Sequence, residues 1–261
     1  PALCFLLDDA QIQKQYIDHL DALTALGKSE LKRCKGSSLE ALAAEHLAKI
    51  EQTKIDFTET YGQNILAAFK EYADKGFVEL IPTAATYAYL PHFEDFPEAI
   101  NAQVETGIYS HRHFFGETGE GFWLPYQAWS KGFEWTLRSY GANYTVVDAR
   151  SILFAKDRPD TGIYAPLRTR TSLVVFGLDP DCPKELTGDD GFAQNDVYRS
   201  QRHDIGYELK QDQVSAFFQK NDTRIETGFK YWSNESDDDD LVAYNRELAS
   251  KQTIEDAISF Y

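Results

Sequence analysis

The sequence predicts an α/β fold, and two observations carry this prediction. Short segments rich in β-branched and aromatic residues alternate with longer segments whose apolar residues recur at helical spacing. Such alternation is typical of parallel strands joined by crossover helices. The chain has 261 residues, of which 43% are hydrophobic, so it can form one large domain with a sizeable core.

The first part of the chain is predicted to be mainly helical. Pro1–Leu7 is a brief apolar run that we expect to form a strand or a buried turn. Helical spacing of apolar residues predicts a helix over Ile12–Gly27 or beyond, and Ser37–Glu40 opens a second helical region that extends towards Lys75. Gly76 is the expected C-cap of that region.

The rest of the chain alternates between the two kinds of segment. A helix is predicted from Pro97 to about Phe115, and another over Gly132–Tyr140, ending at Gly141. Asp189–Val197 is polar and rich in turn residues. The predicted strands are short, apolar and bounded by turn residues: Phe77–Ile81, Gly121–Pro125, Tyr144–Val147, Ser172–Phe176 and Arg224–Trp232.

The densest chemistry lies in Gly121–Trp129, where four of nine residues are aromatic. The strand stops at Pro125, because proline cannot donate to a ladder. In α/β folds ligands bind at the carboxyl edge of the strands. Tyr126, Gln127 and Trp129 therefore stand where a catalytic group is expected, and none of them is a carboxylate.

Composition restricts the class of ligand. The formal net charge of −16 argues against a nucleic-acid partner, which needs clustered Lys and Arg. Aromatic residues make up 14% of the chain, including 15 Tyr, and their flat faces suit neutral polar ligands such as sugars. The sequence has no apolar run long enough for a membrane span and no signal peptide, which predicts a cytoplasmic protein without a membrane partner.

Neither a metal nor a cofactor is predicted. Cys4, Cys34 and Cys182 are far apart and fit reduced packing thiols. His111 and His113, with His92 as a third ligand, suggest a zinc site, but two residues apart on a helix His111 and His113 face different directions. The acidic run Asp237–Asp240 lacks the glycine and distal glutamate of a calcium loop, which favours a solvated loop.

Several motifs follow one another in an order that matches a known family. They are Val78–Thr86 with Leu90-Pro91, Gly121–Pro125, Asp148 with Ile152-Leu153, Gly162–Pro166, Phe176–Asp181, Val197–Arg199 and Asp204–Tyr207. Together they resemble the catalytic domain of glycoside hydrolase family 57, and within it most closely the 1,4-α-glucan branching enzymes.

The resemblance implies a fold and an activity. The expected fold is an incomplete or distorted (β/α)7 barrel with helical insertions, with residues 1–261 forming a single catalytic-type domain that lacks the family's N-terminal and C-terminal barrel segments. The implied chemistry is a retaining mechanism on α-1,4-glucans, with α-glucan or maltooligosaccharide as the partner and no cofactor. The resemblance identifies no protein partner.

The family's catalytic positions are altered here. Where the family's Trp-Leu-Pro motif continues into the nucleophilic glutamate, this chain has Tyr126, and the family's Thr-His pair is Thr86-Tyr87. The family's His-x-His segment and the segment with the acid aspartate do not appear, and Leu178 replaces an arginine beside Asp179. A phenol with a pKa near ~10 is a poor nucleophile at neutral pH unless it is activated.

The candidate binding residues follow from these positions. Asp148 ends a predicted strand and is a weak catalytic candidate, with capping of the next segment as the alternative. Tyr126 and Trp129 follow a strand end and are candidates for stacking on a sugar, whereas Trp123, inside the strand, also fits the core. The full set of candidate substrate-binding residues is Tyr87, Trp123, Tyr126, Trp129, Asp148 and Asp179.

Three hypotheses remain open at this point. The first is a homologue of the branching enzymes that recognises α-glucan but is inactive or impaired, because the nucleophile position is Tyr126. The second is an active branching enzyme or amylase whose carboxylates come from Asp148 or from segments outside this sequence. The third is a barrel that serves as a scaffold for protein interaction.

Overall fold

The computed structural model describes residues 1–215, 217, 224–237 and 240–261 of the chain. The chain divides into two compact units, which are described here one at a time. Unit 1 comprises Pro1–Ile12 and Tyr61–Pro180, and unit 2 comprises Gln13–Thr60 and Asp181–Tyr261. The organisation of residues 1–261 as one domain stays a prediction.

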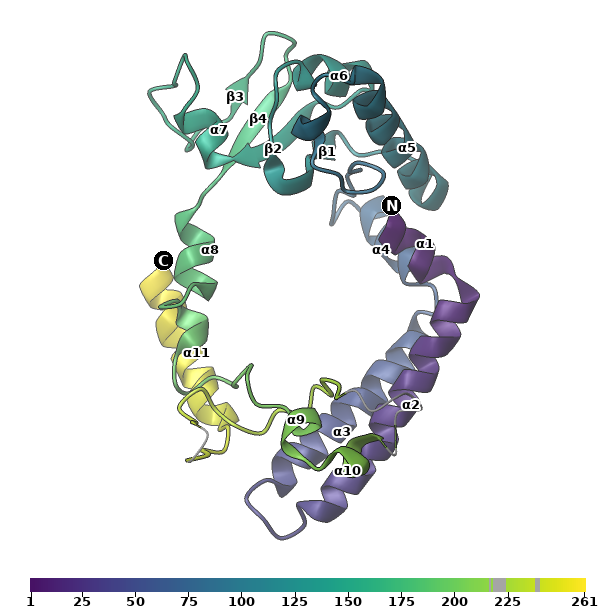
Figure 1. The fold of residues 1–261 in the computed structure, drawn as a ribbon, viewed down its shortest axis with the longest axis vertical. Helices are drawn as coiled ribbons and strands as arrows, with labels where there is room; N and C mark the ends of the chain where they lie inside the picture. The colour runs from purple at the N-terminus through teal and green to yellow at the C-terminus, as the bar shows by residue number, and fades with distance from the viewer. Residues whose placement is uncertain (216, 218–223, 238–239) are drawn as a thin grey trace. The chain divides into compact units, whose positions relative to one another are not determined.

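Unit 1 is built on a four-stranded sheet in the order β1-β2-β4-β3 (Figure 1). The strands are β1 (Gly121–Trp123), β2 (Tyr144–Asp148), β3 (Leu167–Arg168) and β4 (Val174–Leu178). β2 pairs in parallel with both β1 and β4, whereas β3 pairs antiparallel with β4. The α/β class is thus confirmed, but the sheet is mixed because of β3, which the sequence pattern did not predict.

Helices α5 (Pro97–Phe115), α6 (Phe133–Ser139) and α7 (Ala149–Leu153) share an apolar core with this sheet. Helix α4 (Ile65–Asp74) contacts α5, and α1 (Ala2–Asp8) contacts α4. Two 3-10 turns lie at Leu90–Phe93 (η2) and Pro125–Gln127 (η3). Val104, Phe122, Leu137, Val147 and Leu173 are each at most 1% exposed and bring α5, α6 and the strands together. Burial of such side chains stabilises the fold by roughly 1.5–3 kcal/mol each.

Helix α5 illustrates how well local signals fix an element. Pro97 occupies the first turn, where its missing N–H costs nothing, and Arg112 and His113 lie in the last turn, where cations favour the helix dipole. Gly116, with φ of 82°, ends the helix. The predicted bounds of this helix are confirmed. Gly76 also has a positive φ, and Phe77 N donates to Tyr72 O at 3.0 Å, which confirms the C-cap expected for α4.

Three predictions of local structure were wrong. The segment 1–7, expected as a strand or a buried turn, consists of the N-cap Pro1 and the first six residues of α1, which packs against α4 instead of pairing with a sheet. Residues 77–81 form no regular strand, because only single backbone bonds and one bridge, Thr83 to Trp123, join this segment to β1. Residues 224–232 likewise contain only an isolated bridge at Trp232.

Unit 2 is mainly helical in the part that the structure describes. Its elements are α2 (Ala10–Arg33, from Gln13 onward), α3 (Glu40–Ile55), the π-helix η1 (Asp56–Thr60), α8 (Asp181–Thr187), η4 (Phe192–Gln194), α9 (Ile205–Glu208), α10 (Gln211–Ser215) and α11 (Arg246–Phe260). Leu26, Ala43, Ile205, Phe229 and Tyr231 form its core, each at most 1% exposed. The long helical region predicted after Ser37 is real but is broken by η1 and by a turn at residues 61–64.

Three further features bear on the sequence predictions. Cys4, Cys34 and Cys182 are free thiols. No helix in the described part of the chain is long and apolar enough to cross a membrane. Of the acidic run at residues 237–240, Asp238 and Asp239 lie outside the described residues, while the backbone N–H of Asp240 donates to Asp237 Oδ1 at 2.7 Å.

Candidate functional site

The carboxyl end of β1 leads into a strained turn. Tyr126 and Gln127, in η3, have φ values of 58° and 51°. These values lie in the left-handed region, which residues other than glycine seldom adopt. Backbone strain of this kind persists only where the surroundings enforce it, and it gathers at functional sites. The turn presents the ring of Tyr126 outward, with 59% of the residue exposed.

Three tyrosines gather at this turn. The ring of Tyr126 lies 5.4 Å from that of Tyr87 and 6.1 Å from that of Tyr89, between ring centroids. These separations are within the favourable range for aromatic pairs, about 4.5–7 Å. The three residues are between 42% and 59% exposed, so the tyrosine cluster (Tyr87, Tyr89 and Tyr126) has aromatic surface accessible to a ligand.

Trp123 is joined to the tyrosine cluster by a hydrogen bond. Its indole Nε1 donates to the hydroxyl of Tyr87 at 3.1 Å, which ties the end of β1 to the segment that carries two of the tyrosines. Tyr87 itself has φ of 55°. The structure therefore brings together three of the six predicted binding residues, Tyr87, Trp123 and Tyr126. Tyr89 was missed, although it stands two residues after Tyr87 in the same apolar segment.

The segment before Tyr87 is held against β1 by backbone contacts. Thr83 Oγ1 donates to the carbonyl of Trp123 at 2.8 Å, and Trp123 N donates to the carbonyl of Pro82 at 2.9 Å. On the other side, Gly107 of α5 approaches so closely that a Cβ there would lie 1.9 Å from the carbonyl oxygen of Thr83. Because Gly107 has no side chain, α5 can pack directly on the backbone at Thr83, and this contact fixes the position of the segment that carries Tyr87 and Tyr89.

Asp148 is engaged by its own helix. Its carboxylate caps α7, accepting from the backbone N–H of Arg150 at 2.8 Å and from its guanidinium at 2.8 and 3.0 Å. These hydrogen bonds with Arg150 hold the pKa of Asp148 below its ordinary value. The capping alternative is therefore confirmed, and this carboxylate stays ionised at neutral pH.

The other two predicted binding residues, Trp129 and Asp179, take no part in the ring contacts of the tyrosine cluster. Trp129 packs against the core of unit 1 and makes an edge contact with Phe133, with 6.2 Å between ring centroids. Asp179 follows the end of β4 and is exposed.

The histidines of α5 differ in environment. His111 is buried, and its Nε2 has no hydrogen-bond partner in the described part of the chain, whereas His113 is exposed and stacks near Phe5. Burial lowers the pKa of His111. Among the described residues, no group of three or more His, Cys, Asp or Glu side chains is placed to hold a metal ion.

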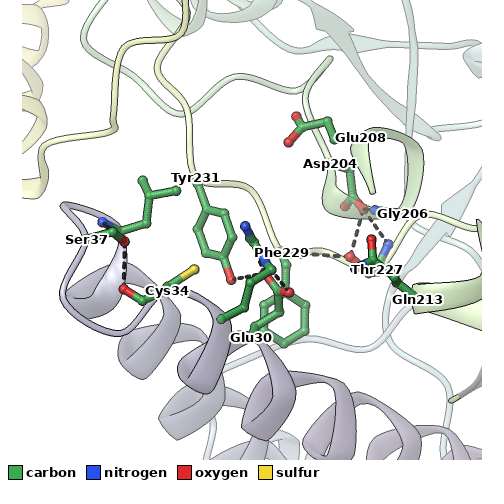
Figure 2. Close-up of polar contacts among 12 residues, drawn as sticks. Glu30, Cys34, Ser37, Asp204, Gly206, Glu208, Gln213, Thr227, Phe229 and Tyr231 are labelled. Carbon is green, nitrogen blue, oxygen red and sulfur yellow. Dashed lines mark hydrogen bonds and ion pairs between the residues drawn. The ribbon is translucent and has the colours of Figure 1, made fainter. Parts of the chain in front are cut away.

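Unit 2 contains a buried polar cluster that the sequence pattern did not reveal (Figure 2). The carboxylate of Asp204, 2% exposed, accepts from Gly206 N, from the N–H and hydroxyl of Thr227 and from Gly228 N, at 2.7–2.9 Å. Glu30 of α2, also 2% exposed, accepts from the hydroxyl of Tyr231 at 3.1 Å and from the guanidinium of Arg33 at 2.8 and 2.6 Å. Because all oxygens of the two carboxylates accept hydrogen bonds within the fold, these side chains join segments of unit 2 and are not available to a substrate.

A sheet with helices packed on it and an exposed aromatic cluster at the carboxyl end of a parallel strand defines an α/β protein. The sequence model of glycosyl hydrolase family 57 matches residues 7–258, and the chain therefore belongs to that family.

Similar proteins narrow the comparison. The chain is 26% identical over 179 residues to the 1,4-alpha-glucan branching enzyme TK1436 of Thermococcus kodakarensis, covering 63% of this chain and 26% of that protein. Among solved structures, the alpha-amylase AmyC from Thermotoga maritima superposes with a TM-score of 0.91 at 27% identity, over 98% of this chain and 50% of that one. The GH57-type branching enzyme from Pyrococcus horikoshii gives a TM-score of 0.77 at 22% identity, over 98% and 46%.

The crystal structure of TK1436 in complex with glucose and additives has a TM-score of 0.78 to this chain at 22% identity, covering all of this chain and 48% of that one. The chain thus spans about half the length of the solved relatives and about a quarter of the curated one.

Proposed function

We propose that this chain is an α-glucan-recognising homologue of the family 57 branching enzymes that has lost most or all of its catalytic activity. The observation that carries this proposal is the identity of Tyr126. Gly121–Pro125 resembles the family motif that leads to the nucleophile, and Tyr126 follows it directly in this chain. A phenol then stands where the chemistry needs a carboxylate.

The surroundings of Tyr126 do not activate it. A nucleophilic tyrosine needs a base or a cation beside its hydroxyl, because its pKa is otherwise near ~10. In the described part of the chain, the hydroxyl of Tyr126 has no hydrogen-bond partner, and its ring contacts are Tyr87 and Tyr89. Retaining glycosidases place two carboxyl groups about 5–5.5 Å apart. Asp148, already bonded to Arg150, is the one carboxylate predicted to act here.

The tyrosine cluster supports glucan recognition without catalysis. Exposed aromatic rings stack on the apolar faces of sugars, and a neutral glucan is compatible with a chain of net charge −16. In this proposal the sheet of unit 1 is part of a distorted (β/α)7 barrel, residues 1–261 form one catalytic-type domain, and the protein acts in the cytoplasm. Trp129, Asp148 and Asp179 complete the proposed glucan-binding residues.

A second candidate is an active amylase or branching enzyme. The similarity to AmyC, which extends over 98% of this chain at 27% identity, favours it. Its functional carboxylates would then be Asp148 or groups outside this sequence.

The test is turnover of amylose by the full-length protein. New branch points and new reducing ends are measured for the wild type, for Tyr126→Phe and for Asp148→Asn. We expect no turnover above the protein-free background in any of the three, while maltoheptaose still binds the wild type. Turnover that survives Tyr126→Phe and is lost in Asp148→Asn would establish the active enzyme instead.

A further inference from the structure

Helix α5 carries a group of side chains that could bind a ligand, and this group lies on the face opposite the one that contacts the segment before Tyr87. Gln103 and Gly107 contact the segment that precedes Tyr87. Glu105, Tyr109 and Arg112, spaced by four and three residues, share the other face of the helix. This second face is exposed, and Tyr109 is 63% exposed.

This face borders an open cleft. The cleft lies between α5 and the end of α6, has a volume of 350 Å³ and is lined by Glu105, Tyr109 and Arg112 together with Ser139–Gly141. Its volume falls within the range of small-ligand sites, about 300–1,000 Å³. Ile108, 6% exposed, also lines the cleft and anchors α5 in the core. We call it the α5–α6 cleft.

Three polar side chains that line the cleft, Glu105, Arg112 and Tyr140, can form hydrogen bonds with a ligand. Tyr140 and Glu105 both line the cleft, and burial followed by the negative charge of Glu105 raises the pKa of Tyr140, so this phenol stays protonated at neutral pH and can donate a hydrogen bond. Arg112 makes no ion pair in the described part of the chain, so its five N–H donors are available. The cleft thus offers an acceptor, several donors and two aromatic rings within one small volume.

The charge pattern selects a neutral ligand. Glu105 and Arg112 carry opposite charges on one helix face, so the cleft has no dominant sign, and the net charge of −16 repels anions from the molecule as a whole. A ligand rich in hydroxyl groups can accept from Arg112, donate to Glu105 and lay an apolar face on Tyr109. Sugars meet all three requirements.

We propose that the α5–α6 cleft is a second maltooligosaccharide-binding site, separate from the tyrosine cluster. The choice of ligand rests on the proposed function, whereas the location rests on the cleft itself. The two sites share no residue, so substitutions distinguish them. A second site would hold a long glucan on the surface while another stretch of the chain lies at the tyrosine cluster, which raises overall affinity through effective concentration.

The experiment is calorimetric titration of the full-length protein with maltoheptaose. We expect about two ligands per wild-type chain and one per chain in Tyr109→Ala or in Tyr126→Ala, with at least a tenfold loss of affinity at the altered site. Tyr109→Phe, which keeps the ring, should bind as the wild type does. Tyr72→Ala, which removes a tyrosine of similar exposure from α4, is the matched control, and circular dichroism checks that each variant is folded.

The outcomes separate the two proposals. One site that is lost in Tyr126→Ala and unchanged in Tyr109→Ala would overturn the second site and leave the proposed function in place. One site that is lost only in Tyr109→Ala would support the cleft and contradict the binding role of the tyrosine cluster. Absence of binding to the wild type would refute both.

Discussion

His46 is a buried histidine placed beside a cation. It is 8% exposed, and its Nε2 lies 3.1 Å from the carbonyl oxygen of Lys230 and 2.8 Å from Nη1 of Arg199. Burial is the first cause that lowers its pKa, and the positive charge of Arg199 acts in the same direction, against a raising contribution from the Lys230 carbonyl and from Glu45. The folded chain therefore favours the neutral ring.

The pH dependence of stability follows from this shift. As the pH falls, His46 in the unfolded chain takes up a proton at about pH 6.5, whereas His46 in the folded chain takes it up only at a lower pH. The contribution of neutral His46 to stability is therefore complete above that pH and is lost as the pH falls below it. We expect the drop in free energy of unfolding between pH 7.5 and pH 5 to be smaller in His46→Gln than in the wild type, measured by urea denaturation.

Ala102→Ser, an exposed substitution on α5 that removes no titratable group, serves as the control and should keep the wild-type pH dependence. Equal pH dependence in His46→Gln and the wild type would show that His46 titrates alike in the folded and unfolded chains. His111, whose pKa is also lowered by burial, contributes in the same direction and remains in both proteins, so it does not affect the comparison.

At the scale of elements, the contact of α5 with the segment at Thr83 determines the position of the tyrosine cluster. A methyl group at Gly107 would overlap the carbonyl of Thr83, which is backbone and cannot turn aside. We expect Gly107→Ala to destabilise the chain by about 1–3 kcal/mol, the usual cost of overpacking, although alanine favours a helix. Urea denaturation measures this change.

Ala102→Ser, on an exposed position of the same helix, should change stability by less than about 0.7 kcal/mol, the spread of ordinary helix propensities. Because Thr83 is joined to Trp123, and Trp123 to Tyr87, Gly107→Ala should also weaken maltoheptaose binding at the tyrosine cluster. A variant as stable as the wild type would mean that α5 can move away from Thr83 without loss.

At the scale of the whole molecule, the chain has a net charge of −16 and the proposed ligand is neutral, which predicts how glucan binding depends on salt. Ionic strength screens charge pairs but acts weakly on stacking and on hydrogen bonds to neutral groups. We expect the dissociation constant of maltoheptaose to change by less than about twofold between 50 mM and 500 mM NaCl, by calorimetry. A decrease in affinity of tenfold or more would indicate that charged groups dominate recognition.

The sequence by itself determined the elements whose signals are local. The bounds of α5 follow from Pro97, its amphipathic spacing and Gly116. The strand predicted over Gly121–Pro125 exists as β1 but is shorter, because it ends at Trp123, two residues before the proline. The ordered motifs also indicated the family, and the position of Tyr126 within them is enough for the hypothesis that activity is lost.

Only the tertiary structure decided which side chains meet. Residues 77–81 and 224–232 have strand-like composition, but a strand needs a partner, and pairing depends on chain segments far away in sequence. The grouping of Tyr89 with Tyr87 and Tyr126, the engagement of Asp148 by Arg150 and the burial of Asp204 are likewise products of packing. Local propensity fixes the backbone of a segment, whereas the surroundings of a side chain are fixed only when distant segments come together.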